Sequence, residues 1–378
     1  LELAKFMKRK FHTGLCDAIR LFLPAEMRSA KVKELVKTNC FIEDDAKARE
    51  YLSKTRKNAT AIIGIINYLL EKGSDSQTNI NKVFSSSALK KLIDDGVVKT
   101  NDVIIRRKPY SEAEPILKDD IVLTETQQNV VKRIISEKNV FLLHGVTGSG
   151  KTEVYMHCMQ NILANGKTGI MLVPEISLTP QVLMNFRSRF GDNVAILHSG
   201  LSAGERFDEW QRILLGEAKI VIGARSAIFA PLKNIGLIVI DEEHDSSYNS
   251  DSNPRYSTIE VAKERARLSN ASLVLGSATP SLISYHNAMI GNYQLLEMKE
   301  RINKREMPPL TIIDMGEEIR SGNTSIFSGK LVQALKRTID EHNQAMLFIN
   351  RRGYSSFLMC KKCGFVAKCQ DCDVSLVY

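Results

Sequence analysis

The clearest chemistry in the sequence lies between Gly145 and Thr152, which read Gly-Val-Thr-Gly-Ser-Gly-Lys-Thr. This segment fits the phosphate-binding pattern GxxxxGK[ST] at every fixed position, between an apolar run at 140–144 and a helix-like stretch at 153–160. Backbone N–H groups of such a loop surround the β- and γ-phosphates at the positive end of a helix. The sequence therefore predicts a nucleoside triphosphate site formed by Gly145, Val146, Thr147, Gly148, Ser149, Gly150, Lys151 and Thr152.

An acidic segment supplies the second half of such a site. The apolar run 236–240 is typical of a central parallel strand that is covered on both faces, and it ends in Asp241-Glu-Glu-His244. Thr152 and Asp241 would hold Mg²⁺, and Glu242 would orient or deprotonate the attacking water. The predicted catalytic residues are Lys151, Asp241 and Glu242.

Three more strand-like runs end in polar loops. The run at 272–281 carries Ser277 and Thr279, which together with His244 could sense the γ-phosphate and couple hydrolysis to movement. The two earlier runs end in residues that suit phosphate contacts along a nucleic-acid strand, namely Ser177, Thr179, Arg225 and Ser226. Ordinary turn chemistry at a strand end explains any one of these loops equally well.

The order of these segments resembles the superfamily 2 helicases. GVTGSGKT, LVPEISLTP, GARSA, DEEH and GSATPS follow one another and precede FINRRGY. The DEEH box followed by paired cysteines is similar to the PriA family of primosomal replication-restart helicases, from about Leu35 to the end. The resemblance implies an α/β fold with RecA-like lobes. It also implies an ATP-dependent 3′-to-5′ DNA helicase that recognises stalled or abandoned replication forks and initiates primosome assembly.

The resemblance also implies cofactors and partners. ATP and Mg²⁺ would serve the motor, and the full-length parent would hold two Zn²⁺ ions. Its partners would be forked and single-stranded DNA, the single-stranded-DNA-binding protein, and the primosome and replicative-helicase loader proteins.

Two further roles follow from the same resemblance. Gln127 lies where related helicases contact the adenine edge, although a capping turn at Thr124 explains it nearly as well. An aromatic-rich loop after the DEEH box would contact single-stranded DNA through Tyr248, Arg255 and Tyr256. A plain flexible loop is the alternative there.

Charge is spread unevenly along the 378 residues. Residues 1–112 carry 22 basic and 14 acidic side chains, which is +8 of the chain's net charge of +9. A basic N-terminal third favours a polyanionic partner, while a merely solvated basic surface is the alternative. No apolar stretch reaches the length of a membrane span, so we expect a cytoplasmic protein without a membrane partner. The resemblance to DNA helicases further implies that it is nucleoid-associated.

A winged-helix domain is predicted over residues 34–112. Helical patterns at 45–56, 59–70 and 86–93 are followed by an alternating segment at 97–108 that could form a hairpin. The residues expected to contact DNA phosphates here are Lys90, Lys91, Arg106 and Arg107. Many winged helices bind proteins instead, so a protein partner is the alternative.

Four cysteines near the end of the sequence suit zinc, namely Cys360, Cys363, Cys369 and Cys372. They form two CxxC pairs, whereas a redox role is the alternative for a single pair. Only residues 364–368 separate the pairs, so each pair is predicted to be half of its own site, completed by cysteines beyond Tyr378. Cys16, Cys40 and Cys158 are unpaired in sequence and are expected to be core thiols.

The predicted organisation has four parts. These are the tail of an N-terminal domain that binds DNA 3′ ends (1–33, by resemblance), the winged helix (34–112), the first RecA-like lobe (113–325) and the start of a second lobe with a zinc-binding insertion (326–378). The later motor motifs are absent from the sequence, including an arginine that would contact the γ-phosphate. The chain is therefore expected to bind ATP and DNA but to hydrolyse ATP poorly.

Two other functions remain open from the sequence alone. One is a double-stranded DNA translocase or RNA helicase, which would use the same lobes. The other is a non-enzymatic fork-recognition scaffold for helicase loading, in which ATP only switches conformation.

Overall fold

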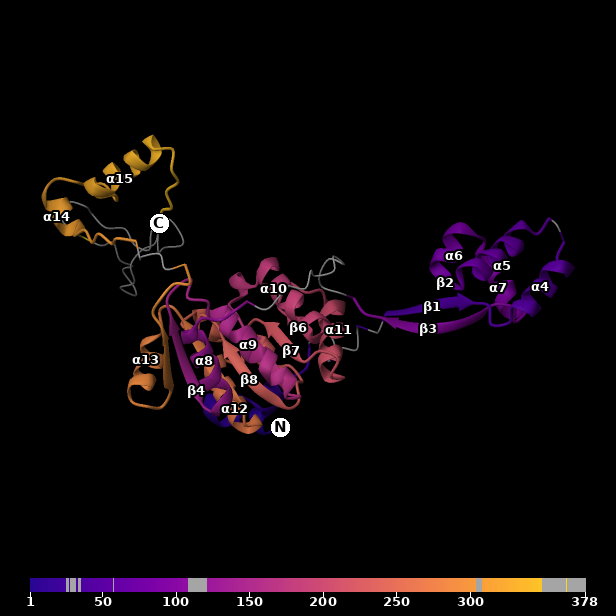
Figure 1. The fold of residues 1–378 in the computed structure, drawn as a ribbon, viewed down its shortest axis with the longest axis horizontal. Helices are drawn as coiled ribbons and strands as arrows, with labels where there is room; N and C mark the ends of the chain where they lie inside the picture. The colour runs from indigo at the N-terminus through magenta and orange to yellow at the C-terminus, as the bar shows by residue number, and fades with distance from the viewer. Residues whose placement is uncertain are drawn as a thin grey trace. The chain divides into compact units, whose positions relative to one another are not determined.

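The computed structural model describes residues 1–24, 27, 32, 35–56, 58–107, 121–303, 308–348 and 365. The chain divides into two compact units, Leu1–Glu306 and Met307–Tyr378. Figure 1 traces both units along the chain. The four cysteines of the predicted zinc sites lie outside the described residues.

A seven-stranded sheet forms the centre of the first unit, and all its strand pairs are parallel. Its order is β10-β4-β9-β8-β5-β7-β6. The strands are β4 (Val140–Gly145), β5 (Thr168–Leu172), β6 (Val194–Leu197), β7 (Ile220–Gly223), β8 (Ile235–Ile240), β9 (Ser272–Ser277) and β10 (Gln294–Met298). β8 and β9 are buried along their whole length, as their apolar sequences predicted. This confirms the predicted RecA-like α/β lobe.

Helices cover both faces of this sheet (Figure 1). They are α8 (Glu125–Ser136), α9 (Lys151–Ala164), α10 (Pro180–Phe190), α11 (Ala203–Leu214), α12 (Thr258–Ser269) and α13 (Leu282–Met289). Because successive side chains of a strand point to opposite faces, Phe141 and Leu143 of β4 enter the core under α8, α9 and α10. Leu142 enters the other core, which contains α12.

Two N-terminal helices, α1 (Glu2–Phe11) and α2 (Leu15–Arg20), contribute to that second core. Leu3, Met7 and Ala18 are buried among residues of α12 and the sheet. The sequence predicted that these residues are the tail of a separate DNA-binding domain, and the structure shows that they share the core of the lobe. Cys16 is exposed rather than a core thiol, because Ala18 is the residue through which α2 is buried.

Residues 35–105 form a small domain with a core of its own. Its helices are α4 (Asp45–Lys54), α5 (Thr60–Lys72), α6 (Gln77–Val83) and α7 (Ser86–Asp94), and its strands are β1 (Leu35–Phe41), β2 (Ser74–Ser76) and β3 (Lys99–Ile105). The three predicted helices are confirmed, and α6 is an additional helix that the sequence pattern did not reveal.

The predicted hairpin after Gly96 is wrong over the described residues 97–107. β3 pairs antiparallel with β1, from Leu35↔Ile105 to Phe41↔Lys99, in a sheet of order β2-β1-β3. All seven residues of β3 pair with β1. The backbone hydrogen-bonding groups of β3 that face β1 are therefore satisfied without a second strand from residues 97–107. The winged-helix assignment itself stays a prediction.

The second unit contains α14 (Met315–Arg320) and α15 (Gly329–Asp340), and α15 confirms the helix predicted from Lys330. The strand predicted from Ala345 is absent over residues 345–348. Met346 and Phe348 are largely exposed there, because nothing in the described part of the unit pairs with this backbone. Within the described ranges, no helix has the length and apolar character needed to cross a membrane.

Candidate active site and strand-binding face

The phosphate-binding loop connects β4 to α9 through two glycines in the left-handed region. Gly148 has φ 82° and Gly150 has φ 83°, which a residue with a Cβ adopts only with strain. Gly145 is also restricted, because a Cβ there would lie 2.7 Å from the Ser149 Oγ. The glycine spacing of the motif therefore has a direct conformational cause.

Two features of this loop fit an anionic ligand. No side chain caps the N-terminus of α9, which leaves its first N–H groups for a phosphate. The Ser149 hydroxyl is buried and has no hydrogen-bond partner among the described residues. Lys151 Nζ donates to the Gly145 carbonyl at 2.8 Å and holds its charge beside the loop. These residues fit a nucleoside triphosphate.

Gln127 contacts the phosphate-binding loop directly. Its Oε1 accepts from the Thr124 N–H at 2.9 Å, which completes a capping box at the start of α8. Its Nε2 donates to the Ser149 carbonyl at 3.1 Å. The capping interpretation is thus confirmed, while contact with adenine stays a prediction. The sequence did not reveal that the same side chain also supports the loop.

Asp241 is held by two tyrosines. The Tyr155 hydroxyl, one turn along α9 from Lys151, donates to Asp241 Oδ1 at 3.0 Å, and the Tyr248 hydroxyl donates to the Asp241 carbonyl at 2.6 Å. Burial, followed by the adjacent Glu242 carboxylate, raises the pKa of Asp241. A divalent cation would offset this unfavourable clustering of charge, so the donor set fits Mg²⁺.

Tyr155 and Gly276 were not recognised as site residues in the sequence. Tyr155 is completely buried, and a Cβ at position 276 would lie 1.8 Å from its hydroxyl. Gly276 in β9 therefore makes room for the hydroxyl that binds Asp241. The small residue before Ser277 was the only sequence signal of this close approach.

The predicted coupling residues form one hydrogen-bonded chain. His244 Nδ1 lies 2.8 Å from Ser277 Oγ, which also accepts from the Thr279 N–H at 3.0 Å. His244 Nδ1 is 3.7 Å from a Glu242 carboxylate oxygen. Glu242 itself has a left-handed φ of 46°, a strained backbone for a residue with a side chain. Contacts thus extend from the predicted base to the segment after β9.

Glu243, in the acidic segment, has a structural role that the sequence analysis did not predict. Its buried carboxylate accepts from the Ser281 N–H at 2.6 Å, the Ser281 hydroxyl at 3.1 Å and the Ser284 hydroxyl at 2.8 Å. These bonds fix the start of α13 to the end of β8. Two serines three residues apart, just after β9, were the available signal.

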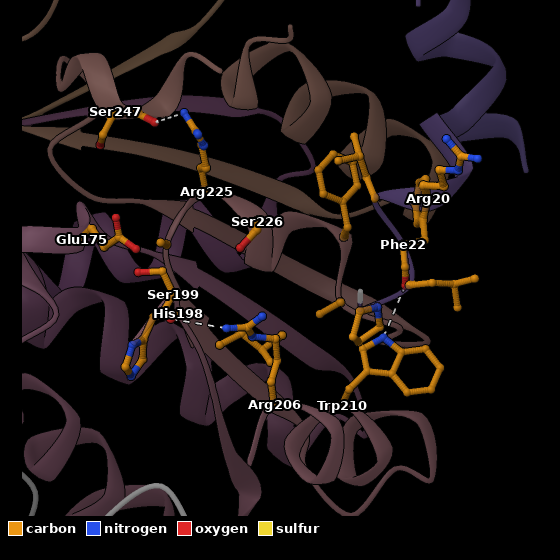
Figure 2. A pocket seen from close by; sticks show the side chains of 17 residues that line it. Arg20, Phe22, Glu175, His198, Ser199, Arg206, Trp210, Arg225, Ser226 and Ser247 are labelled. Atoms are coloured by element: carbon orange, nitrogen blue, oxygen red, sulfur yellow. Dashed lines mark hydrogen bonds between the residues drawn. The ribbon is translucent and has the colours of Figure 1, made fainter. Parts of the chain in front are cut away.

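Arg225 follows β7 and binds the loop that follows the acidic segment. Its Nη1 donates to the Asn249 carbonyl at 2.7 Å and to the Ser247 carbonyl at 3.3 Å. The Ser247 contact is visible in Figure 2, which also shows Ser226; these three residues line one cavity. Thr179 caps α10 by accepting from the Val182 N–H, and Ser177 lies in the turn before it. The residues predicted to contact a nucleic-acid strand therefore lie in loops that follow neighbouring β-strands of the sheet.

Tyr248 and Tyr256 do not lie where base stacking requires them. Tyr248 is 1% exposed and Tyr256 is 7% exposed, and both rings belong to the core beneath α12. Aromatic rings bury a large apolar area, and the Tyr248 hydroxyl is satisfied by Asp241, so internal packing is favoured over exposure. The prediction that bases stack on these two rings is therefore wrong, and both rings have a structural role instead. Arg255 remains exposed, with Nε donating to the Asp251 carbonyl at 3.3 Å.

The four basic residues predicted to contact DNA in the small domain fall into two groups. Lys90 and Lys91 are exposed on α7. Arg106 forms an ion pair with Glu217, and Arg107 Nη1 lies 3.1 Å from the buried Asp208 carboxylate. The buried Asp208 carboxylate needs a cation beside it, so Arg107 has a structural function whether or not it contacts DNA.

No group of three metal-ligating side chains that could hold an ion is found in the described part of the chain. The cysteine pairs lie outside that part, so the zinc sites stay predictions.

The sheet, phosphate-binding loop and acidic segment define a helicase motor lobe. Residues 124–287 match the family model for DEAD/DEAH box helicases. Among solved structures, RecG bound to a three-way DNA junction aligns over 50% of this chain and 24% of its own, with 24% identity and a TM-score of 0.36.

Curated relatives identify the particular helicase family. Replication restart protein PriA of Bacillus subtilis is 43% identical over 100% of this chain and 48% of its own length. PriA of Haemophilus influenzae is 34% identical over 97% of this chain and 50% of its own. The resemblance to the PriA family is confirmed. The chain spans about half the length of these two relatives.

Proposed function

We propose that this chain carries the first motor lobe of an ATP-dependent 3′-to-5′ DNA helicase that recognises stalled or abandoned replication forks and initiates primosome assembly. The observation that carries the proposal is a continuous set of contacts around Asp241 and Glu242. Tyr155 joins Asp241 to the phosphate-loop helix, and His244 joins Glu242 to Ser277. Similarity to PriA along the whole chain supports the DNA substrate.

The residues have distinct roles in the proposed hydrolysis. Lys151 and the N–H groups at the start of α9 bind and orient the phosphates. Thr152 and Asp241 would hold Mg²⁺, which neutralises the charge that develops on the phosphate oxygens. Glu242 would accept the proton of the attacking water, and one of its carboxylate oxygens lies 3.7 Å from His244 Nδ1.

The contacts beyond Glu242 suit the transmission of nucleotide state. His244, Ser277 and Thr279 would respond to the γ-phosphate, since a change at Glu242 alters the partner of His244. On the other side, Arg225 holds the carbonyls of residues 247 and 249, next to Tyr248, which binds the Asp241 backbone. A DNA phosphate that competes for Arg225 would release these carbonyls. The position of Tyr248, and with it that of Asp241, the proposed magnesium ligand, would then change.

Partners and remaining cofactors are part of the same proposal. Forked and single-stranded DNA, the single-stranded-DNA-binding protein and loader proteins of the primosome are the proposed partners, at a cytoplasmic, nucleoid-associated location. The full-length protein is proposed to bind two zinc ions through Cys360, Cys363, Cys369, Cys372 and later cysteines. Elemental analysis that gives a single zinc per full-length chain would exclude the two-site arrangement.

Strand displacement by the full-length protein tests the proposal. We expect ATP-dependent unwinding of forked DNA with a 3′ tail, no unwinding with only a 5′ tail, and none with Lys151→Ala. Preferential unwinding of an RNA duplex would instead identify an RNA helicase. Loader recruitment at forks that survives Lys151→Ala, without any unwinding by wild type, would identify a scaffold.

A further inference from the structure

A cavity of about 540 Å³ opens beside the predicted strand-binding residues (Figure 2). It lies at the carboxyl ends of β5, β6 and β7, and it is closed on one side by the N-terminal segment 20–24. The carboxyl edge of a parallel sheet is the usual position of ligand sites in such folds. Neither the phosphate-binding loop nor the acidic segment lines this cavity.

The two walls of the cavity differ in chemistry, as Figure 2 shows. One wall is polar and carries His198, Ser199, Arg206 and Ser226 from the strand ends. The other wall is apolar, and its members are Leu21, Phe22, Leu23, Pro24, Trp210 and Phe229. A ligand that fills the cavity must therefore have one polar and one flat apolar part.

The apolar wall is preformed. The Trp210 indole N–H donates to the Phe22 carbonyl at 3.3 Å, which ties the N-terminal segment to α11. The Phe22 and Phe229 rings meet edge to face, with centroids 5.1 Å apart. Because both contacts are internal, the wall needs no ligand to assemble, which lowers the entropic cost of binding.

Charge favours an anionic ligand. Three of the lining side chains are arginines, Arg20, Arg206 and Arg225, whereas Glu175 is the only carboxylate among the lining residues. Arg206 donates to the carbonyls of Ser199 and Leu201, which fixes it in the polar wall. Burial lowers the pKa of His198, and its Nδ1 accepts from the Gly200 N–H at 3.1 Å, so the neutral ring carries its proton on Nε2, which can donate to a ligand.

We propose that this cavity receives one nucleobase of the bound single strand, packed against the accessible members of the apolar wall, Phe22 and Leu23, while its phosphate lies at Arg225 and Ser226. This inference rests on the proposed function, because it requires that the lobe binds DNA through those two residues. A volume of several hundred Å³ is typical of a small-ligand pocket and accommodates a single nucleotide. A base within a duplex is already stacked and paired, so the site would select unpaired DNA.

The sequence supplies a direct probe of occupancy, since Trp210 is its only tryptophan. We expect an oligothymidylate to quench the fluorescence of Trp210 on binding to this chain. An oligomer of the same length, with the same phosphates but abasic throughout, should bind more weakly by about tenfold, the size expected for losing one stacked base, and should leave the fluorescence unchanged.

A filling substitution with a matched control completes the test. Leu23 is 39% exposed in the cavity wall, and Leu268, away from the cavity on α12, is 42% exposed. Leu23→Tyr should remove the preference for oligothymidylate over the abasic oligomer, while Leu268→Tyr should retain it. Thermal unfolding of both variants would verify that they fold.

The outcomes separate this inference from the proposed function. Equal binding of both oligomers without a fluorescence change would overturn the base pocket and leave DNA binding intact. Failure of either oligomer to bind would contradict the proposed function itself. Unchanged base preference in Leu23→Tyr would also overturn the inference, because it would show that the bases are bound outside this cavity.

Discussion

The motor lobe and the small domain place their polar side chains in different ways. In the lobe, strands buried on both faces deliver Asp241, Ser277 and Arg225 to one edge of a parallel sheet. In the small domain, β3 is exposed along nearly its whole length, and the basic side chains lie on the surface of α7 or just after β3.

This difference has energetic consequences. Charges near Asp241 are held by buried hydrogen bonds and are weakly screened, so single changes there should have large effects. Exposed charges on α7 act through solvent, so changes there should be modest and sensitive to salt. Effects of substitution should therefore decrease from the phosphate-binding loop to the small domain, and a different order would contradict this comparison.

The largest effects are expected at the phosphate-binding loop and the acidic segment. Lys151→Ala should remove most nucleotide affinity, because it deletes the charge beside the phosphates. Glu242→Gln should retain binding and lower turnover by about 10²- to 10⁴-fold, the usual contribution of a general base. Nucleotide titration and steady-state ATPase assays of the full-length protein measure both. Lys132→Ala, on the exposed face of α8, is the matched control. Wild-type ATPase activity in either site variant would contradict the assignment.

A second pair of variants tests the close approach of β9 and α9. Gly276→Ala should destabilise the lobe by about 1–3 kcal/mol, because its Cβ collides with the buried Tyr155 hydroxyl. Tyr155→Phe removes that oxygen, so the double variant should be more stable than the sum of the two single changes predicts. Urea unfolding of all four proteins gives this coupling energy. Strict additivity would show that the two residues do not share the space.

The two lysines of α7 and Arg107, which follows β3, should behave differently. Lys90→Gln with Lys91→Gln should weaken DNA binding a few-fold at low salt and reduce the salt slope by about one to two units, if both lysines contact phosphates. Arg107→Gln should instead destabilise the protein, because it leaves the buried Asp208 without its cation. Binding isotherms at several salt concentrations, with thermal unfolding, distinguish the two. An unchanged salt slope in the lysine variant would favour a protein partner for α7.

The smallest effect is expected at Asp75, which links α5 to α6 and directly precedes Ser76, the N-cap residue of α6. Hydrogen bonds from Lys72, Tyr68 and Asn79 lower the pKa of this carboxyl below its ordinary value of 3.8. A lowered pKa in the folded state stabilises the domain above about pH 4, and this stabilisation is lost as pH falls towards the folded pKa. Asp75→Asn should therefore weaken the domain at pH 7 and differ less from wild type in acid.

Hydrogen exchange of the α5 and α6 amides measures this local stability. Asp94→Asn, on the exposed end of α7, is the control. A stability difference between Asp75→Asn and wild type that grows on acidification would contradict the prediction.

Sequence reasoning was most accurate in the lobe because its signals are local. An apolar run followed by small or acidic residues predicts a buried strand and its loop, and the structure confirms this for β4, β8 and β9. The helices of the small domain were also predictable from their own periodicity. Strand pairing was not, because β1 and β3 lie about sixty residues apart and either could have paired elsewhere.

The sequence by itself predicted which residues would bind a nucleotide, since the glycines, the lysine and the acidic strand end are recognised from their neighbours along the chain. Only the tertiary structure decided how those residues are held. Tyr155 meets Asp241 across 86 residues, and Tyr248 is turned into the core rather than towards a strand. Such contacts depend on which faces of distant elements pack together, and local sequence rules carry no information about that packing.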